Sequence, residues 1–121
     1  MSGKLRRTAD YLAHMSEAIR RIASYIDDID RAAFEQDIRT QDAVIRNLEI
    51  IGEAARNVLE HDPAFAAAHP EIPWALAYRT RNALSHGYAE IDLATVWSTV
   101  RQDLPELQRN LMSLLVKTQQ D

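Results

Sequence analysis

The chain has no cysteine, and only three glycines and four prolines among its 121 residues. The lack of cysteine excludes a disulfide framework and any zinc site built on thiolates. Sheet proteins need many turns, and turns use glycine and proline, so their scarcity favours long helices joined by few loops. No apolar run is long enough to span a membrane. The basic residues 1–7 are not followed by the apolar segment of a signal peptide. We therefore expect a cytoplasmic protein whose residues 1–121 form a single helical domain.

The chain also lacks an excess of positive charge, since its formal net charge is -4. This acidic balance argues against indiscriminate binding of nucleic acid, which needs a basic face. It does not exclude a local basic cleft, and Arg79 and Arg81 lie two positions apart.

Apolar residues recur at spacings of three and four in the first half of the chain, as amphipathic helices require. This pattern predicts a helix over about 4–26 and a second over 41 to about 60, with Thr40 as N-cap. The segment 27–40 is predicted to be a polar connection that is anchored by the large side chain of Phe34.

In the second half, we expect a short alanine-rich piece ending near 69–70 and a helix from Pro73 to about His86, where Gly87 stops it. Asp92 is the predicted N-cap of the last helix, and Pro105 predicts a kink near 101–103. Trp74 and Trp97 are expected in the core. The fold class is all-α, an antiparallel bundle of four to five helices.

The second helix carries a ridge opposite its apolar face. This ridge consists of five residues: Arg46, Glu49, Ile50, Glu53 and Asn57. A solvated face with paired charges would explain it. However, Ile50 lies in the middle of the ridge, and Gly52 allows a neighbouring segment to approach the flank of this helix closely. We therefore favour a ridge that faces a dimer partner or an active-site cleft. His14, His61 and His69 have no neighbours at metal-ligand spacing and are interpreted as surface or capping residues.

Candidate catalytic residues are concentrated in segment 79–88, where Arg81, His86 and Tyr88 offer complementary functional groups. The guanidinium of Arg81 offers a fork of donors suited to a phosphate. His86 can take or give a proton near neutral pH, and a helix C-terminus favours its protonated form. Gly87 frees the backbone to bring Tyr88 back over the helix end. Together these groups can cleave RNA without a metal or cofactor. The predicted supporting or RNA-binding positions are Arg79, Asn82 and Ser85 in the same segment, and Arg46 on the ridge of the second helix.

The spacing of Arg81, His86 and Tyr88 resembles the signature of the HEPN superfamily as it occurs in HepT-like toxins. The blocks 40–55, 69–74 and 96–105 resemble the same family, in the same order. The resemblance implies a HEPN-like helical fold, a homodimer and a ribonuclease site in the dimer cleft. It carries Arg81, His86 and Tyr88 over as functional residues.

The same resemblance implies the toxin of a type II or type VII toxin–antitoxin system. Its partner would be a nucleotidyltransferase antitoxin, which neutralises the toxin by transferring AMP to Tyr88. An alternative is a non-catalytic module that binds nucleotide or substrate for a separate nucleotidyltransferase, and a plainer one is an inert helical dimer. The trio could also be structural, with the arginine and histidine bonding helix carbonyls and the tyrosine packing. A proton-transfer group at His86 favours the ribonuclease, because a pure binding module needs none.

Overall fold

The computed structural model describes residues 3–75, 77 and 91–120, and every regular element in these ranges is helical. This confirms the all-α class. None of the described helices has the length and apolarity needed to cross a bilayer. The elements are α1 (Gly3–Ile26), α2 (Arg31–Glu35), α3 (Ile38–His61), α4 (Pro63–Ala68), α6 (Leu93–Ser98), a π-helical turn (Thr99–Asp103) and α7 (Leu104–Gln120).

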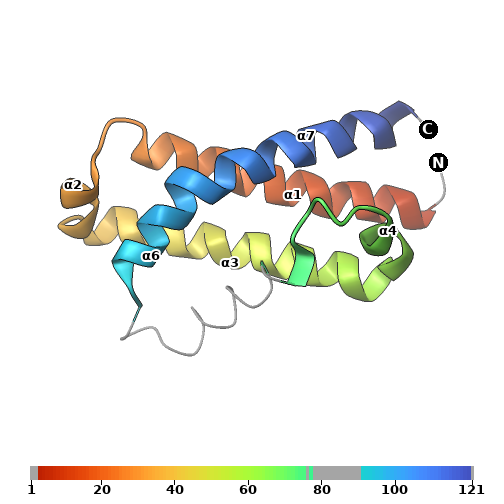
Figure 1. Ribbon diagram of the computed structural model, residues 1–121, viewed down its shortest axis with the longest axis horizontal. Coiled ribbons are helices and arrows are strands. Elements are labelled where there is room, and N and C mark those ends of the chain that lie inside the picture. Colours follow the sequence, from red (N-terminus) through yellow and green to blue (C-terminus); the bar gives the residue numbers. More distant parts are fainter. Residues whose placement is uncertain (1–2, 76, 78–90, 121) are drawn as a thin grey trace.

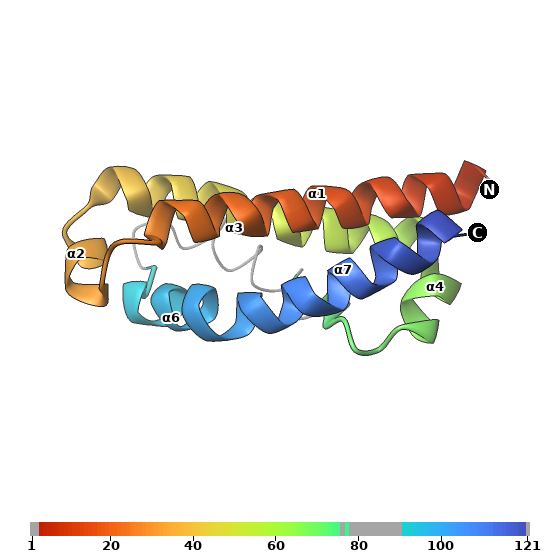
Figure 2. The same cartoon turned by 90° about the horizontal axis from the view of Figure 1, so that it is seen from above.

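The two longest helices, α1 and α3, lie side by side and antiparallel, and α6 and α7 cover one face of this pair (Figures 1 and 2). Helix α7 also runs antiparallel to α1 (Figure 1). The short helices α2 and α4 lie at opposite ends of the bundle (Figure 2). The predicted antiparallel arrangement is therefore confirmed.

The apolar stripes predicted from the sequence form the core between these helices. The side chains that are buried share helical spacing within each element. They include Leu12, Met15, Ile19, Ile22 and Ile26 on α1; Val44, Leu48, Ile51, Ala55 and Val58 on α3; and Val96, Val100, Leu104, Leu107, Leu111 and Leu114 on the last helical stretch.

Aspartate side chains begin four of the described helices. Each carboxylate accepts a hydrogen bond from a backbone N–H of the first turn, which otherwise has no partner. The caps are Asp30 on α2, Asp37 on α3, Asp62 on α4 and Asp92 on α6. The cap at Asp92 was predicted from the sequence.

The predicted start of the second long helix was wrong. Thr40 is not its N-cap, because the helix already begins at Ile38. The Asp37 carboxylate accepts from the Thr40 backbone N–H at 3.1 Å and from its hydroxyl at 2.6 Å. The connection 27–40 also contains the short helix α2, which places the Phe34 side chain fully inside the core, as expected of an anchor.

The predicted kink near 101–103 is confirmed as a π turn over Thr99–Asp103. Pro105 has no N–H to donate, so a regular helix would leave a carbonyl unpaired one turn earlier. At the end of the π turn, the Leu104 N–H instead reaches back to the Thr99 carbonyl. Trp97 precedes the turn, packs against Phe34 at 5.2 Å between ring centroids and carries the Arg101 guanidinium over its ring. It is half-buried at the edge of the core.

A buried polar contact ties the start of α1 to the junction of α3 and α4. The Thr8 hydroxyl, 1% exposed, donates to Asp62 Oδ2 at 3.0 Å and lies 3.1 Å from the Lys4 carbonyl oxygen. Asp62 also caps α4 by accepting from the Phe65 N–H. One carboxylate therefore holds three helices in register.

We predict that Thr8→Val lowers the free energy of unfolding by about 1–3 kcal/mol, because the buried Asp62 carboxylate loses a donor. Urea unfolding measures the change. The matched control is Thr118→Val, since the Thr118 hydroxyl is also buried and, among the described residues, bonds a carbonyl of its own helix. An equal loss in both variants would contradict the assigned role.

The caps at Asp37 and Asp92 predict acid sensitivity. The Thr40 hydroxyl and backbone N–H hold the pKa of Asp37 below its ordinary 3.8. The Thr95 hydroxyl and the Ala94 N–H do the same to the pKa of Asp92. Since both pKa values are lowered by folding, their stabilisation is present above the unfolded-state pKa and is lost as pH falls through the folded pKa.

The double variant Asp37→Asn, Asp92→Asn keeps capping side chains that do not titrate. We expect its free energy of unfolding to fall less than that of the wild type between about pH 5 and about pH 2. Urea unfolding at a series of pH values measures this difference. Asp28→Asn serves as control, because Asp28 caps none of the described helices. An unchanged pH dependence in the double variant argues against the caps as its source.

Candidate functional site

The segment with the predicted catalytic residues lies outside the described part of the chain. This applies to Arg79, Arg81, Asn82, Ser85, His86 and Tyr88. Their grouping therefore stays a prediction. The described residues nevertheless show how the bundle holds the chain on both sides of this segment.

Before the segment, the chain is anchored by Trp74, which is 5% exposed. Its indole Nε1–H is shared between the carbonyl oxygens of Ala66 at 3.2 Å and His69 at 3.1 Å. A helical turn follows, in which the Ala77 N–H donates to the Pro73 carbonyl at 3.0 Å. This confirms the predicted core position of the tryptophan and the predicted start of a helix at the proline.

After the segment, the chain is fixed by Asp92. Its carboxylate accepts from the Ala94 N–H at 3.0 Å and from the Thr95 hydroxyl at 2.8 Å. Ala77 and Thr95 also line one shared cleft with Leu48 of α3. Residues on both flanks of the predicted catalytic segment therefore line one cleft with the same helix.

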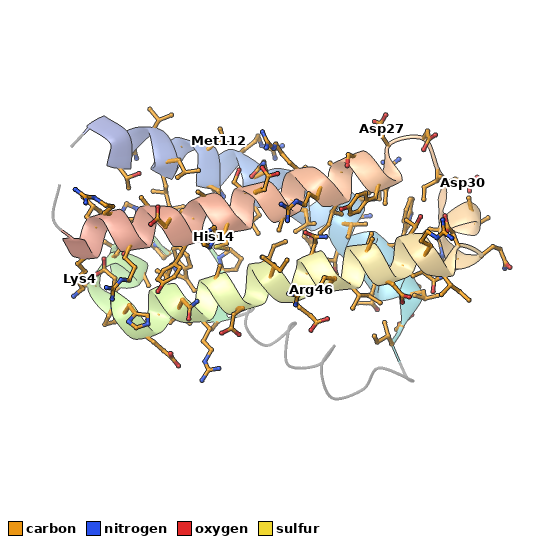
Figure 3. The ribbon with its side chains drawn as sticks, turned by 180° about the vertical axis from the view of Figure 1, so that it is seen from behind. Lys4, His14, Asp27, Asp30, Arg46 and Met112 are labelled. Carbon is orange, nitrogen blue, oxygen red and sulfur yellow. The ribbon has the colours of Figure 1, made fainter. Side chains whose placement is uncertain are left out.

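The ridge predicted on the second long helix lies on α3 and is called the α3 ridge from here on. It lines a cleft of about 320 Å³. All five ridge residues contribute to it, together with His14 from α1 and Ala54. The cleft lies on the face of the α1–α3 pair seen in Figure 3, where His14 and Arg46 are labelled. The structure therefore supports the interpretation of the ridge as more than a uniformly solvated surface.

The α1–α3 cleft combines groups of opposite character. Arg46 supplies a guanidinium, Glu49 and Glu53 supply carboxylates, and the half-buried Ile50 supplies an apolar surface between them. Within the described ranges, no ion pair joins Arg46 to either carboxylate. In contrast, Arg31–Glu35 and Arg56–Glu60 form i,i+4 ion pairs at 3.1 and 2.9 Å.

This composition limits what the cleft can bind. Arg46 can donate hydrogen bonds and Glu49 can accept them, so the described lining suits a ligand that has both acceptors and donors. The described residues contain no group of histidine and acidic side chains that could hold a metal ion. The Arg46 guanidinium, which forms no ion pair with a described residue, is the group most able to contact an acceptor edge.

Sequence reasoning missed the part that His14 plays in this cleft. The interpretation as a surface residue is correct, since its side chain is exposed. No local spacing links it to the α3 ridge, and only the antiparallel packing of α1 against α3 brings the two together. Pairing the two predicted apolar stripes as antiparallel helices would have placed His14 beside the ridge.

Comparison with known proteins covers most of the chain. The family described as ribonuclease HepT-like matches residues 15–114, which include the α3 ridge and the 79–88 segment. A "Probable ribonuclease HepT" of Thermococcus cleftensis is 44% identical over 98 residues, 81% of this chain and 86% of that protein. A "Putative RNase" of Methanocaldococcus jannaschii is 35% identical over 95 residues, 78% of this chain and 76% of that protein.

Another protein of the same archaeon is named "Gamma-glutamylcyclotransferase and putative RNase". It is 34% identical over 105 residues, 87% of this chain and 46% of that longer protein. No solved structure gives a significant match. The extent of the family match and the identity to these relatives show that the chain belongs to the HepT-like ribonuclease family.

Proposed function

We propose that this protein is a metal-independent endoribonuclease whose reaction is carried out by Arg81, His86 and Tyr88. One observation carries the proposal: the family match over residues 15–114 spans the three residues at the spacing of the motif. The names of the relatives, which include "Probable ribonuclease HepT", support the same activity.

The proposed chemistry is transfer of the RNA phosphodiester to the neighbouring 2′-hydroxyl. A base removes the proton of that hydroxyl, its oxygen attacks phosphorus, and the bond to the 5′-oxygen breaks as that oxygen takes up a proton. His86 can serve in either proton transfer, because imidazole titrates near neutral pH. The Arg81 guanidinium stabilises the negative charge that builds on the phosphorane oxygens.

We further propose that the protein acts in the cytoplasm as a homodimeric toxin under the control of a nucleotidyltransferase antitoxin. The antitoxin would transfer AMP from ATP to the Tyr88 hydroxyl, with release of pyrophosphate. AMP on this side chain adds bulk two residues from His86 and places a phosphate charge near Arg81. Steric block and charge neutralisation would then act together to inhibit the enzyme.

We predict that His86→Ala lowers the rate of RNA cleavage by about 100-fold or more, since general acid–base catalysis contributes on this scale. The measurement is cleavage of a labelled RNA in the presence of EDTA. The wild type should remain active in EDTA, because the motif supplies no pair of carboxylates for a metal. Circular dichroism verifies the fold of each variant.

The control for this substitution is His61→Ala, which removes an exposed histidine stacked on Tyr11. Its cleavage rate should equal that of the wild type. Full activity of a folded His86→Ala variant would refute the proposed role, and loss of wild-type activity in EDTA would refute a metal-independent reaction.

The proposed regulation by the antitoxin predicts a covalent modification of Tyr88. Co-expression with the nucleotidyltransferase partner should raise the mass of the peptide that contains Tyr88 by one or more AMP units, as read by mass spectrometry. Tyr88→Phe lacks the acceptor oxygen and should stay unmodified, whereas Tyr78→Phe should be modified like the wild type. A neutralised complex with an unmodified Tyr88 would show inhibition by binding alone.

A further inference from the structure

We propose that the α1–α3 cleft is a base-binding subsite that selects guanine in single-stranded RNA. This inference rests on the proposed ribonuclease function and names a feature of its substrate. It is carried by the juxtaposition of Arg46, Glu49 and Ile50 in one cleft of about 320 Å³, between α1 and α3.

The described lining residues indicate which part of an RNA would enter the cleft. Arg46 offers hydrogen-bond donors, Glu49 offers acceptors, and the half-buried Ile50 offers an apolar surface. A phosphate has only acceptors and would leave Glu49 and Ile50 unused, whereas a nucleobase has flat faces and both donors and acceptors along its edges. Bases in single-stranded RNA are free to be read in this way, because their edges are not paired.

The arrangement of donors and acceptors on α3 distinguishes among the four bases. Arg46 and Glu49 are three residues apart, so their side chains are neighbours on the helix surface. An arginine fork binds two adjacent acceptors, and a carboxylate binds two adjacent donors. Guanine offers O6 and N7 as adjacent acceptors on one edge, and N1–H and the 2-amino group as adjacent donors on the next.

The other three bases match only one of the two side chains, Arg46 or Glu49, or neither. Adenine and cytosine place a single amino group beside a ring nitrogen acceptor, which a carboxylate would repel. Uracil has one N–H between two carbonyl groups. Guanine therefore satisfies both Arg46 and Glu49, and each of the other bases leaves at least one of these charged groups without a matching edge.

The remaining lining groups fit a flat aromatic ligand. Ile50 lies on the same face of α3, one turn after Arg46, and is half-buried, so it offers an apolar surface for the face of a base. Asn57 and the exposed His14 line the same cleft and add polar groups within its walls. A single base needs less room than the drug-sized ligands that fill pockets of about 300 Å³ and above.

Binding of RNA that cannot be cleaved tests the subsite separately from catalysis. The probes are fluorescent 2′-O-methyl oligouridines that carry guanine, adenine, hypoxanthine or 7-deazaguanine at one central position. These oligonucleotides lack the attacking 2′-hydroxyl. We expect the wild type to bind the guanine probe about tenfold or more tightly than the adenine probe, as judged by fluorescence anisotropy.

Substitution of Glu49 and substitution of Arg46 should each remove one part of the preference for guanine. Glu49→Gln should bind guanine and hypoxanthine equally, because hypoxanthine lacks only the 2-amino group that the carboxylate would bind. Arg46→Met should bind guanine and 7-deazaguanine equally, because 7-deazaguanine lacks the N7 acceptor. Glu106→Gln, an exposed glutamate on α7 outside the cleft, should keep the wild-type preference.

Absence of a guanine preference in the wild type, or its survival in both folded variants, would overturn the inference. Sedimentation of the same samples tests the competing role of this face. If Arg46→Met and Glu49→Gln dissociate the protein into smaller species without changing base preference, the cleft is an interface between two copies and the inference is wrong. A wild type that prefers guanine but cleaves no RNA would refute the proposed function and leave the subsite standing.

Discussion

The apolar stripes of α1 and α3 face each other along helices of 24 residues each. A helix of this length is about 36 Å long, so a small rotation of one helix would displace many core side chains together. The contact between Thr8 and Asp62 fixes the register at one end of the pair. Three other features depend on this register: the packing of α6 and α7 over the pair, the buried position of Trp74, and the cleft that His14 lines.

Helix α3 contributes to the core and to two clefts. One face carries Val44 and Val58 into the core, and the opposite ridge carries Arg46 and Glu49 into the α1–α3 cleft. On the core face, Leu48 also lines a second cleft together with residues from the two flanks of the 79–88 segment. Because a helix is rigid over a few turns, the proposed base subsite and the flanks of the proposed catalytic segment are held in a fixed relation by a single element.

Sequence periodicity predicted most of the fold because the apolar stripes are long and regular. The kink before Pro105 followed from a missing N–H donor. The start of α3 was misplaced because both Asp37 and Thr40 are capping residue types, and only the hydrogen bond from the Thr40 backbone N–H to the Asp37 carboxylate shows which one caps. Of the site, the α3 ridge could be read from helical spacing. The approach of His14 could not, since it arises from packing between helices far apart in sequence.

The π turn over Thr99–Asp103 holds one residue more than an α-helix would place over the same rotation, because its hydrogen bonds span five residues instead of four. Deleting one residue there would restore ordinary helical hydrogen bonding and leave the helix that follows at nearly its present rotation relative to α6. Leu107 and Leu111 would keep their places in the core. A single-codon deletion within the regular part of α7 would instead rotate all later residues by about 100° and turn their apolar stripe away from the core. The π turn is therefore the place in this helical stretch where the loss of one residue leaves the packing of α7 intact.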